Sequence, residues 1–98
     1  MIVITGSARV PEENRAEFTK VAERQVRLSR EEPGNISYGW FEDRMERGRF
    51  FFYEEWKDRE AVEFHFARDY CHEFMEAARR LAETEPQINI REVMVKGK

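Results

Sequence analysis

The feature that most constrains this sequence is a short aromatic stretch from Phe50 to Trp56, whose composition predicts a β-strand. Successive side chains of a strand point to opposite faces. Phe50 and Phe52 therefore share one face, and Phe51 and Tyr53 share the other. The helices of a small domain cover only one face of a sheet, and burying one Phe is worth roughly 1.5–3 kcal/mol. We therefore expect a second copy of the chain to cover the other face, which makes the protein a homodimer.

The hydrophobic pattern on either side of this strand predicts one small α+β domain. Apolar residues alternate along 2–10, follow helical spacing along 12–31 and return to a strand pattern before a polar loop at 42–48. A helix then begins at its predicted N-cap, Asp58, bends near Arg68 and ends before Pro86. With residues 1–98 in one domain, this order suits a ferredoxin-like four-stranded antiparallel sheet with helices on one face.

Two of the predicted strands carry finer expectations about which side chains share a face. In the strand before the polar loop, Ile36, Tyr38 and Trp40 have the same parity. The last strand alternates from Ile88 through to Val95. Both patterns are typical of half-buried strands.

Charge and cysteine content argue against several classes of function. The 17 basic and 20 acidic side chains nearly balance, whereas a nucleic-acid-binding surface carries a basic excess. No apolar run approaches the ~20 residues of a membrane span, and residues 1–10 lack the pattern of a signal peptide, so we expect a cytoplasmic protein. Cys71 is the single cysteine, and His65 and His72 are seven residues apart across the bend, so no metal site is expected.

Several short motifs follow one another along the chain. They are Glu32-Pro33-Gly34 at the end of the first helix, Tyr38, the strand Phe50-Phe51-Phe52-Tyr53-Glu54-Glu55-Trp56, His65 nine residues after Trp56, and Arg91-Glu92-Val93. In this order and spacing, the motifs resemble the antibiotic biosynthesis monooxygenase family.

The resemblance implies a dimeric α+β barrel, in which two four-stranded sheets pack face to face. It does not fix one activity, because members include cofactor-independent monooxygenases of phenols or quinols, haem-degrading enzymes and an isomerase-like enzyme. The haem-degrading branch has an asparagine in its first strand and a second histidine where this chain has Met75, and residues 1–10 contain no asparagine. We therefore expect no cofactor.

His65 is the candidate catalytic residue, because it matches the family's helix histidine and a histidine exchanges protons near neutral pH. Moving a proton from a phenol of pKa ~10 to a histidine of pKa ~6.5 is uphill by roughly 5 kcal/mol. The substrate anion therefore needs stabilising donors, for which Tyr53, Trp56 and Arg91 are candidates. The predicted substrate-binding residues are Tyr38, Phe52, Tyr53, Trp56, Tyr70 and Arg91.

Other interpretations of the same residues stay open. His65 is structural if a carboxylate such as Glu54 satisfies it in the core. The leading hypothesis is cofactor-independent oxidation of a small aromatic phenol or quinol, and its rivals are an isomerase or other proton-transfer enzyme of a small carbonyl compound and a non-catalytic dimeric binding module. A basic pair in the pocket would favour an acidic or phosphorylated substrate and the isomerase. An apolar pocket with one histidine and a few hydroxyl or indole donors would favour the phenol, and a filled interior would favour the binding module.

Overall fold

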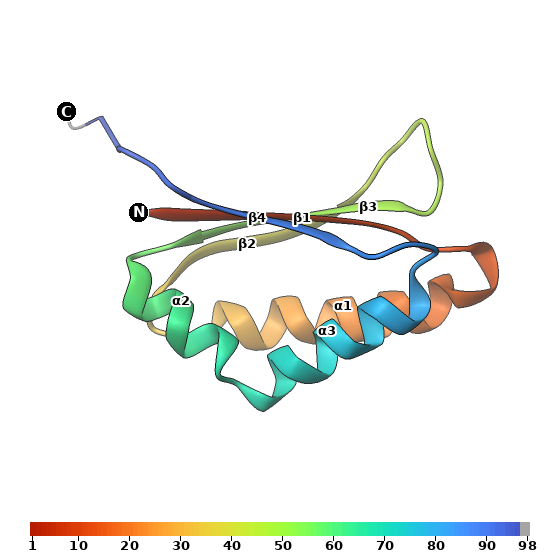
Figure 1. Cartoon of the computed structure of the whole chain (residues 1–98), viewed down its shortest axis with the longest axis horizontal. Helices are drawn as coiled ribbons and strands as arrows, with labels where there is room; N and C mark the ends of the chain where they lie inside the picture. Colours follow the sequence, from red (N-terminus) through yellow and green to blue (C-terminus); the bar gives the residue numbers. More distant parts are fainter. Residues whose placement is uncertain (97–98) are drawn as a thin grey trace.

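Four antiparallel strands form the sheet of the computed structural model, which describes residues 1–96 (Figure 1). The strands are β1 (Ile2–Arg9), β2 (Asn35–Glu42), β3 (Arg49–Trp56) and β4 (Gln87–Glu92), and they lie in the order β2-β3-β1-β4. The remaining elements are a 3₁₀ turn, η1 (Glu12–Asn14), and the helices α1 (Arg15–Arg30), α2 (Arg59–Phe66) and α3 (Asp69–Leu81). The predicted ferredoxin-like α+β fold is confirmed.

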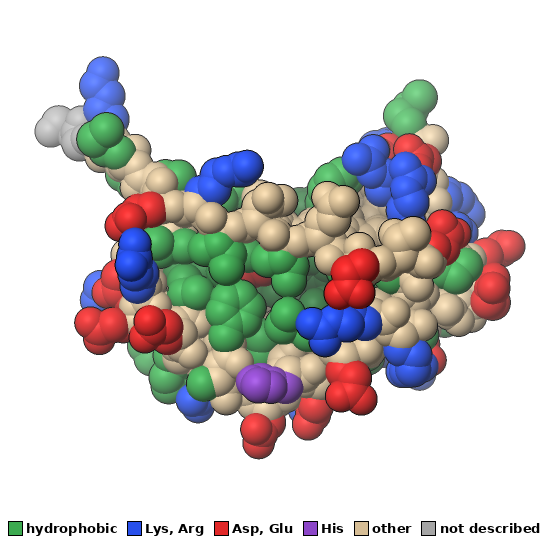
Figure 2. All heavy atoms as spheres, viewed as in Figure 1, with side chains coloured by type: hydrophobic (Ala, Val, Ile, Leu, Met, Phe, Trp, Pro, Cys, Tyr) green, Lys and Arg blue, Asp and Glu red, His purple; other side chains and the backbone are tan. Residues whose placement is uncertain are grey.

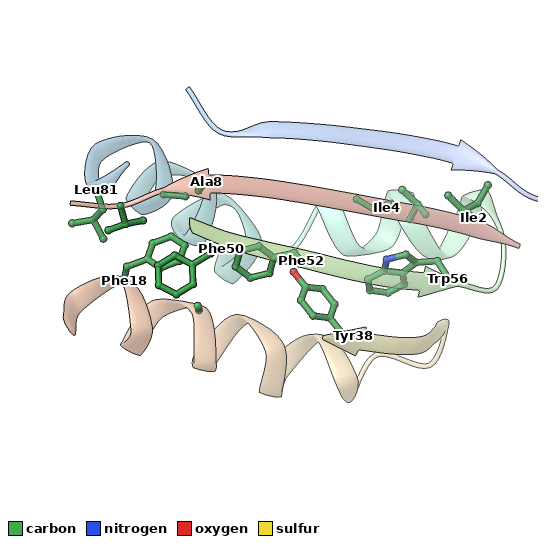
Figure 3. Close-up of a cluster of buried hydrophobic side chains, with 13 residues drawn as sticks. Ile2, Ile4, Ala8, Phe18, Tyr38, Phe50, Phe52, Trp56 and Leu81 are labelled. Atoms are coloured by element: carbon green, nitrogen blue, oxygen red, sulfur yellow. The ribbon is translucent and has the colours of Figure 1, made fainter. Parts of the chain in front are cut away.

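All three α-helices lie on one side of the sheet, and the other side is bare (Figure 1). On the helix side, Phe50, Phe52 and Trp56 of β3 are buried, and Phe18 of α1 packs with its ring centroid 5.0 Å from that of Phe50 (Figure 3). On the bare side, Phe51 is 36% exposed. The expectation that β3 has two apolar faces, of which the helices cover one, is confirmed.

The predicted helix at 12–31 is present as η1 followed directly by α1, which ends at Arg30. Two other expectations, about a face and about a strand end, need correction. Ile36 is 55% exposed and does not share the burial of Tyr38, because the β2–β3 pairing is irregular between Asn35 and Ser37. The last strand ends at Glu92, its partner being Ile2 at the start of β1, so Met94 and Val95 are not part of it. Among the described residues, no helix is long and apolar enough to cross a membrane.

The turn after α1 brings α2 close to the end of α1. Asp58 caps α2 by accepting a hydrogen bond from the Ala61 amide (2.9 Å), as predicted. Ala61 then lies so close to Gly34 that a Cβ at Gly34 would sit 2.3 Å from the Ala61 Cβ. Because residues four apart share a face of a helix, this approach also turns His65 toward Glu32. Glycine at position 34 therefore allows the close approach of α2 that positions the histidine.

Candidate active site

A cavity of about 160 Å³ lies between the sheet and the helices. Its mouth is lined by residues from the end of α3 and the segment leading into β4, among them Arg79, Glu85 and Gln87. Figure 2 shows apolar side chains gathered in a hollow between the sheet edge and the helices. The apolar walls come from Ile4, Phe18, Phe52, Phe66, Phe74, Met75, Ala78 and Ile88. The cavity is therefore apolar along most of its length and open to solvent at one end.

The deep part of the cavity is polar. Five lining side chains there carry polar or titratable groups and belong to residues that are at most 6% exposed: Gln25, Tyr38, Glu54, His65 and Cys71. They come from α1, β2, β3, α2 and α3. Because buried polar groups are costly unless they are satisfied, so many from five elements mark this end as a candidate functional site.

His65 is held by hydrogen bonds at one ring nitrogen and faces other titratable groups at the second. Its Nδ1 lies 2.8 Å from Oε2 of buried Glu32, which also accepts a hydrogen bond from the Tyr70 hydroxyl. A carboxylate at Nδ1 holds the ring proton there, so that Nε2 carries the free lone pair. Nε2 lies 3.9 Å from Oε1 of Glu54 and 3.6 Å from the Cys71 thiol. Burial lowers the pKa of His65, and the interaction with Glu32 opposes that shift.

Glu54 is the second titratable group that faces the cavity. Burial raises its pKa from 4.5 to about 7, although hydrogen bonding from Trp56 and Tyr38 works in the other direction. The Trp56 indole Nε1 donates to Glu54 Oε1 over 3.0 Å. The pKa of Tyr38 is raised well above its usual value by burial and by the charge of Glu54, so this phenol keeps its proton. Glu54 is therefore a carboxyl group that gains and loses a proton near neutral pH, which suits a general acid or base.

Cys71 is poorly suited to act as a nucleophile. The residue is 1% exposed, and burial raises the pKa of its thiol to about 11. At neutral pH the sulfur therefore carries its proton and is not the reactive thiolate.

Among residues 1–96, no group of three or more His, Cys, Asp or Glu side chains is arranged to hold a metal ion.

The structure gathers most of the predicted site residues but not all of them. Tyr38, Phe52 and His65 line the cavity. Trp56 and Tyr70 lie directly behind it, where one donates to Glu54 and the other to Glu32; Figure 3 shows Tyr38, Phe52 and Trp56 projecting from the sheet toward the helices.

Tyr53 and Arg91 lie on the bare face of the sheet, away from His65. Tyr53 alternates with the buried Phe52 and donates to Glu55, and Arg91 pairs with Val3, the neighbour of buried Ile4. Within one chain, the prediction that these two side chains donate hydrogen bonds in the same pocket as His65 is wrong, because strand parity sends them to the other side.

Three buried residues of the site were not proposed as functional from the sequence. The sequence places Glu32 in the motif after the first helix and offers Glu54 as a structural partner of His65, and nothing in the motifs points to Gln25. A signal for two of them was available. Glu54 has the parity of Phe52 and Trp56, and Gln25 is a polar side chain on an apolar helical stripe.

Comparison with known proteins gives a family and one sequence relative. Residues 1–77 match the model of the family described as "Antibiotic biosynthesis monooxygenase". An uncharacterized protein from Synechocystis sp. is 37% identical over 89 residues, a match that covers 91% of this chain. The match covers 60% of that relative, so the chain spans less than two thirds of its length.

Solved structures with the same fold are more distant in sequence. A candidate antibiotic biosynthesis monooxygenase from Deinococcus radiodurans superposes with a TM-score of 0.91 at 22% identity, covering 100% of this chain and 97% of that one. The structure of an antibiotic biosynthesis monooxygenase superposes with a TM-score of 0.88 at 21% identity, covering 97% of this chain and 100% of that one. A conserved protein from Methanosarcina mazei superposes with a TM-score of 0.87 at 24% identity, covering 92% of this chain and 89% of that one. At these identities the likeness establishes the shared fold.

Proposed function

The chain belongs to the antibiotic biosynthesis monooxygenase family, and we propose that it is a cofactor-independent monooxygenase that oxidises a small aromatic phenol or quinol. The observation that supports this most is the deep end of the cavity. There the Nε2 of His65, held by Glu32 at the other ring nitrogen, lies 3.9 Å from a carboxyl group whose pKa is about 7. Two proton acceptors at the end of an aromatic-lined cavity suit the removal of a proton from a phenol.

The lining of the cavity favours a neutral phenol over an acidic or phosphorylated substrate. Apart from His65, the basic side chain among the described lining residues is Arg79, and its Nε lies 3.2 Å from Oε1 of Glu85, which also lines the mouth. The mouth therefore carries no uncompensated positive charge to attract an anion. The cavity is open and holds one histidine and the Tyr38 hydroxyl. These features support oxidation of a phenol more strongly than they support an isomerase or a non-catalytic binding module.

In the proposed reaction, oxygen accepts electrons from the substrate after the protein removes a proton. Transfer from a phenol of pKa ~10 to Glu54, whose pKa is about 7, is uphill by roughly 4 kcal/mol, which is less than transfer to an ordinary histidine. The phenolate passes one electron to O₂, and the resulting radical pair joins a ring carbon to oxygen. Loss of the hydrogen from that carbon breaks the O–O bond, so phenol and O₂ give a quinone and one water.

The bare face of the sheet supports the proposal that the protein works as a homodimer. Phe41, Phe51 and Tyr53 are 59%, 36% and 42% exposed there, next to one another in the β2–β3 pairing. A contiguous exposed apolar patch usually marks an interaction site. Two such faces packed together would form the dimeric barrel that the family resemblance implies.

The test of the reaction is incorporation of labelled oxygen by the purified protein. Protein shown to be free of flavin, haem and metal is incubated with a substituted hydroquinone or phenol under ¹⁸O₂, and the product is analysed by mass spectrometry. The proposal expects one ¹⁸O atom in the quinone and faster oxygen uptake than without protein. Turnover with hydrogen peroxide as the oxygen product, and no label in the quinone, would show an oxidase and contradict the proposal.

A further inference from the structure

We infer that the substrate is a single-ring phenol that enters the cavity hydroxyl first, and that Gln25 is a specificity-determining residue that recognises this hydroxyl. The inference rests on the proposed function, because it names the substrate class of the same site. Three features carry it: the size of the cavity, the Glu54 carboxyl group at its deep end, and the unpartnered amide oxygen of Gln25.

The space between the sheet and the helices holds about one aromatic ring. Its volume is about 160 Å³, and a buried cavity of roughly 150 Å³ holds one benzene molecule. The walls are largely aromatic and close-packed, with the Phe52 and Phe74 ring centroids 5.3 Å apart. Making room for three fused rings would separate side chains that pack at contact distance, which is unfavourable. A small apolar substituent fits toward Met75 and Ile88, which also line the cavity.

One residue at the deep end carries a hydrogen-bond acceptor that has no donor in the protein. The Oε1 of Gln25 has no hydrogen-bond partner in the protein, although the residue is 2% exposed. The Gln25 amide lowers the pKa of both Tyr38 and Cys71, as an N–H donor does, so its donor end is directed toward those groups. Glu54 adds carboxylate oxygens beside the same tyrosine, since its charge raises the pKa of Tyr38. Gln25 and Glu54 therefore converge on one region.

A ligand hydroxyl satisfies this arrangement, and a ligand carbonyl or ether does not. A phenol O–H donates to one acceptor, and after ionisation its proton resides on Glu54. A buried acceptor left without a donor is unfavourable, so a ligand that supplies the donor gains roughly tenfold in affinity over one that does not. The same rule disfavours a ketone at this position, which separates the inference from the isomerase alternative.

The inference is tested by ligand binding, which needs no turnover. Calorimetric titrations at pH 8 under nitrogen compare 4-ethylphenol, ethylbenzene and the three-ring phenol 9-phenanthrol. The expected result is binding of 4-ethylphenol at least tenfold tighter than that of ethylbenzene, with 9-phenanthrol weaker than 4-ethylphenol. Equal binding of 4-ethylphenol and ethylbenzene, or tighter binding of 9-phenanthrol, would overturn it.

Two variants on the same stripe of α1 assign the selectivity to Gln25. In Gln25→Leu the preference for 4-ethylphenol over ethylbenzene should fall by about tenfold. Removal of the unpartnered oxygen is stabilising and loss of the N–H donor to Tyr38 and Cys71 is destabilising, so the melting temperature should change little. Ser29→Ala is the matched control. It also removes an unpartnered buried oxygen, but Ser29 is not among the residues that line the cavity, so the preference should persist.

The variants and the ligand panel also separate failure of the inference about Gln25 from failure of the proposed function. A Gln25→Leu protein that keeps the full preference would overturn the role of Gln25, and if this variant does not fold, Gln25→Met serves the same comparison. Should the binding pattern hold while neither 4-ethylphenol nor a hydroquinone consumes oxygen, the proposed oxidation is wrong and the recognition of a phenol hydroxyl stands.

Discussion

Glu54→Gln is expected to make the protein more stable and less active at the same time. Glutamine keeps the size of the side chain and an oxygen that accepts the hydrogen bond from Trp56, and it removes only the ionisable oxygen. Burial raises the pKa of Glu54 from 4.5 to about 7. This difference of about 2.5 pH units corresponds to roughly 3 kcal/mol between the buried and the solvated carboxylate.

The pH range of this gain follows from the direction of the shift. Between pH 4.5 and about 7 the folded wild type keeps a proton on Glu54 that the unfolded chain has lost, so its free energy of unfolding falls as the pH rises. The variant has no such group. Urea unfolding should therefore give similar stabilities below pH 4.5 and a variant more stable by roughly 3 kcal/mol above pH 7. His65, whose lowered pKa has the opposite effect, is present in both proteins.

The activity of the same variant identifies the role of the carboxylate. Wild-type oxygen uptake should rise with pH to a plateau with a midpoint near 7, and in Glu54→Gln it should fall by about 10²-fold or more. Glu63→Gln is the control, because Glu63 lies on the exposed side of α2, and neither stability nor rate should change there. A Glu54→Gln protein no more stable than wild type at pH 8 would refute the argument from burial, and one that keeps full activity would show that Glu54 is not the base.

Three further variants test other parts of the structure. Gly34→Ala places a methyl group 2.3 Å from the Ala61 Cβ, so the free energy of unfolding should fall by about 1–3 kcal/mol in urea melts; adding Ala61→Gly should restore it, and a lone Gly34→Ala without effect would contradict the close approach. Phe51→Asp should convert the proposed dimer to monomer or unfold it in light scattering, because it buries an unpaired charge, whereas a wild type already monomeric at micromolar concentration would rule the dimer out. His65→Asn keeps a donor for Glu32 but lacks Nε2, so oxygen uptake should drop about 10²-fold with a melting temperature above that of His65→Ala, and retained activity would remove His65 from the mechanism.

The fold was predictable because its signals are local. Strand alternation in β1, helical spacing in α1 and α3, the Asp58 cap and the break before Asp69 each depend on a few neighbouring residues, and all four appear as expected. The exposure of Ile36 depends instead on how β2 pairs with β3, because an irregular register changes which side chains are covered. The end of β4 likewise depends on where its partner strand begins.

The candidate site was only partly predictable, since it is assembled by contacts between distant segments. The motif match identified His65, but the 33-residue separation between His65 and Glu32 hid the pair that orients the ring. Tyr53 and Phe52 are consecutive in a strand and cannot both face one cavity, so the parity of β3 alone assigns Glu54, and not Tyr53, to the side of Phe52. The alternation of β4 likewise puts Arg91 on the other face from Ile88 and Ile90, in agreement with the β1–β4 register.

The end of α1 and the turn after it carry a cost that the fold alone does not explain. Gln25 and Ser29 of α1 and Glu32 of the turn are buried, and each has an oxygen without a partner in the protein. Each such atom costs about 1–3 kcal/mol, in a domain whose size leaves a small stability margin. Local rules are broken in this way chiefly at functional sites. For Glu32 the cost is explained by its hydrogen bond to His65. For Gln25 it is explained by the proposed hydrogen bond to a ligand hydroxyl. Ser29 has neither, so Ser29→Ala should stabilise the protein or leave it unchanged without altering function. A loss of activity in that variant would mean that the site extends to Ser29.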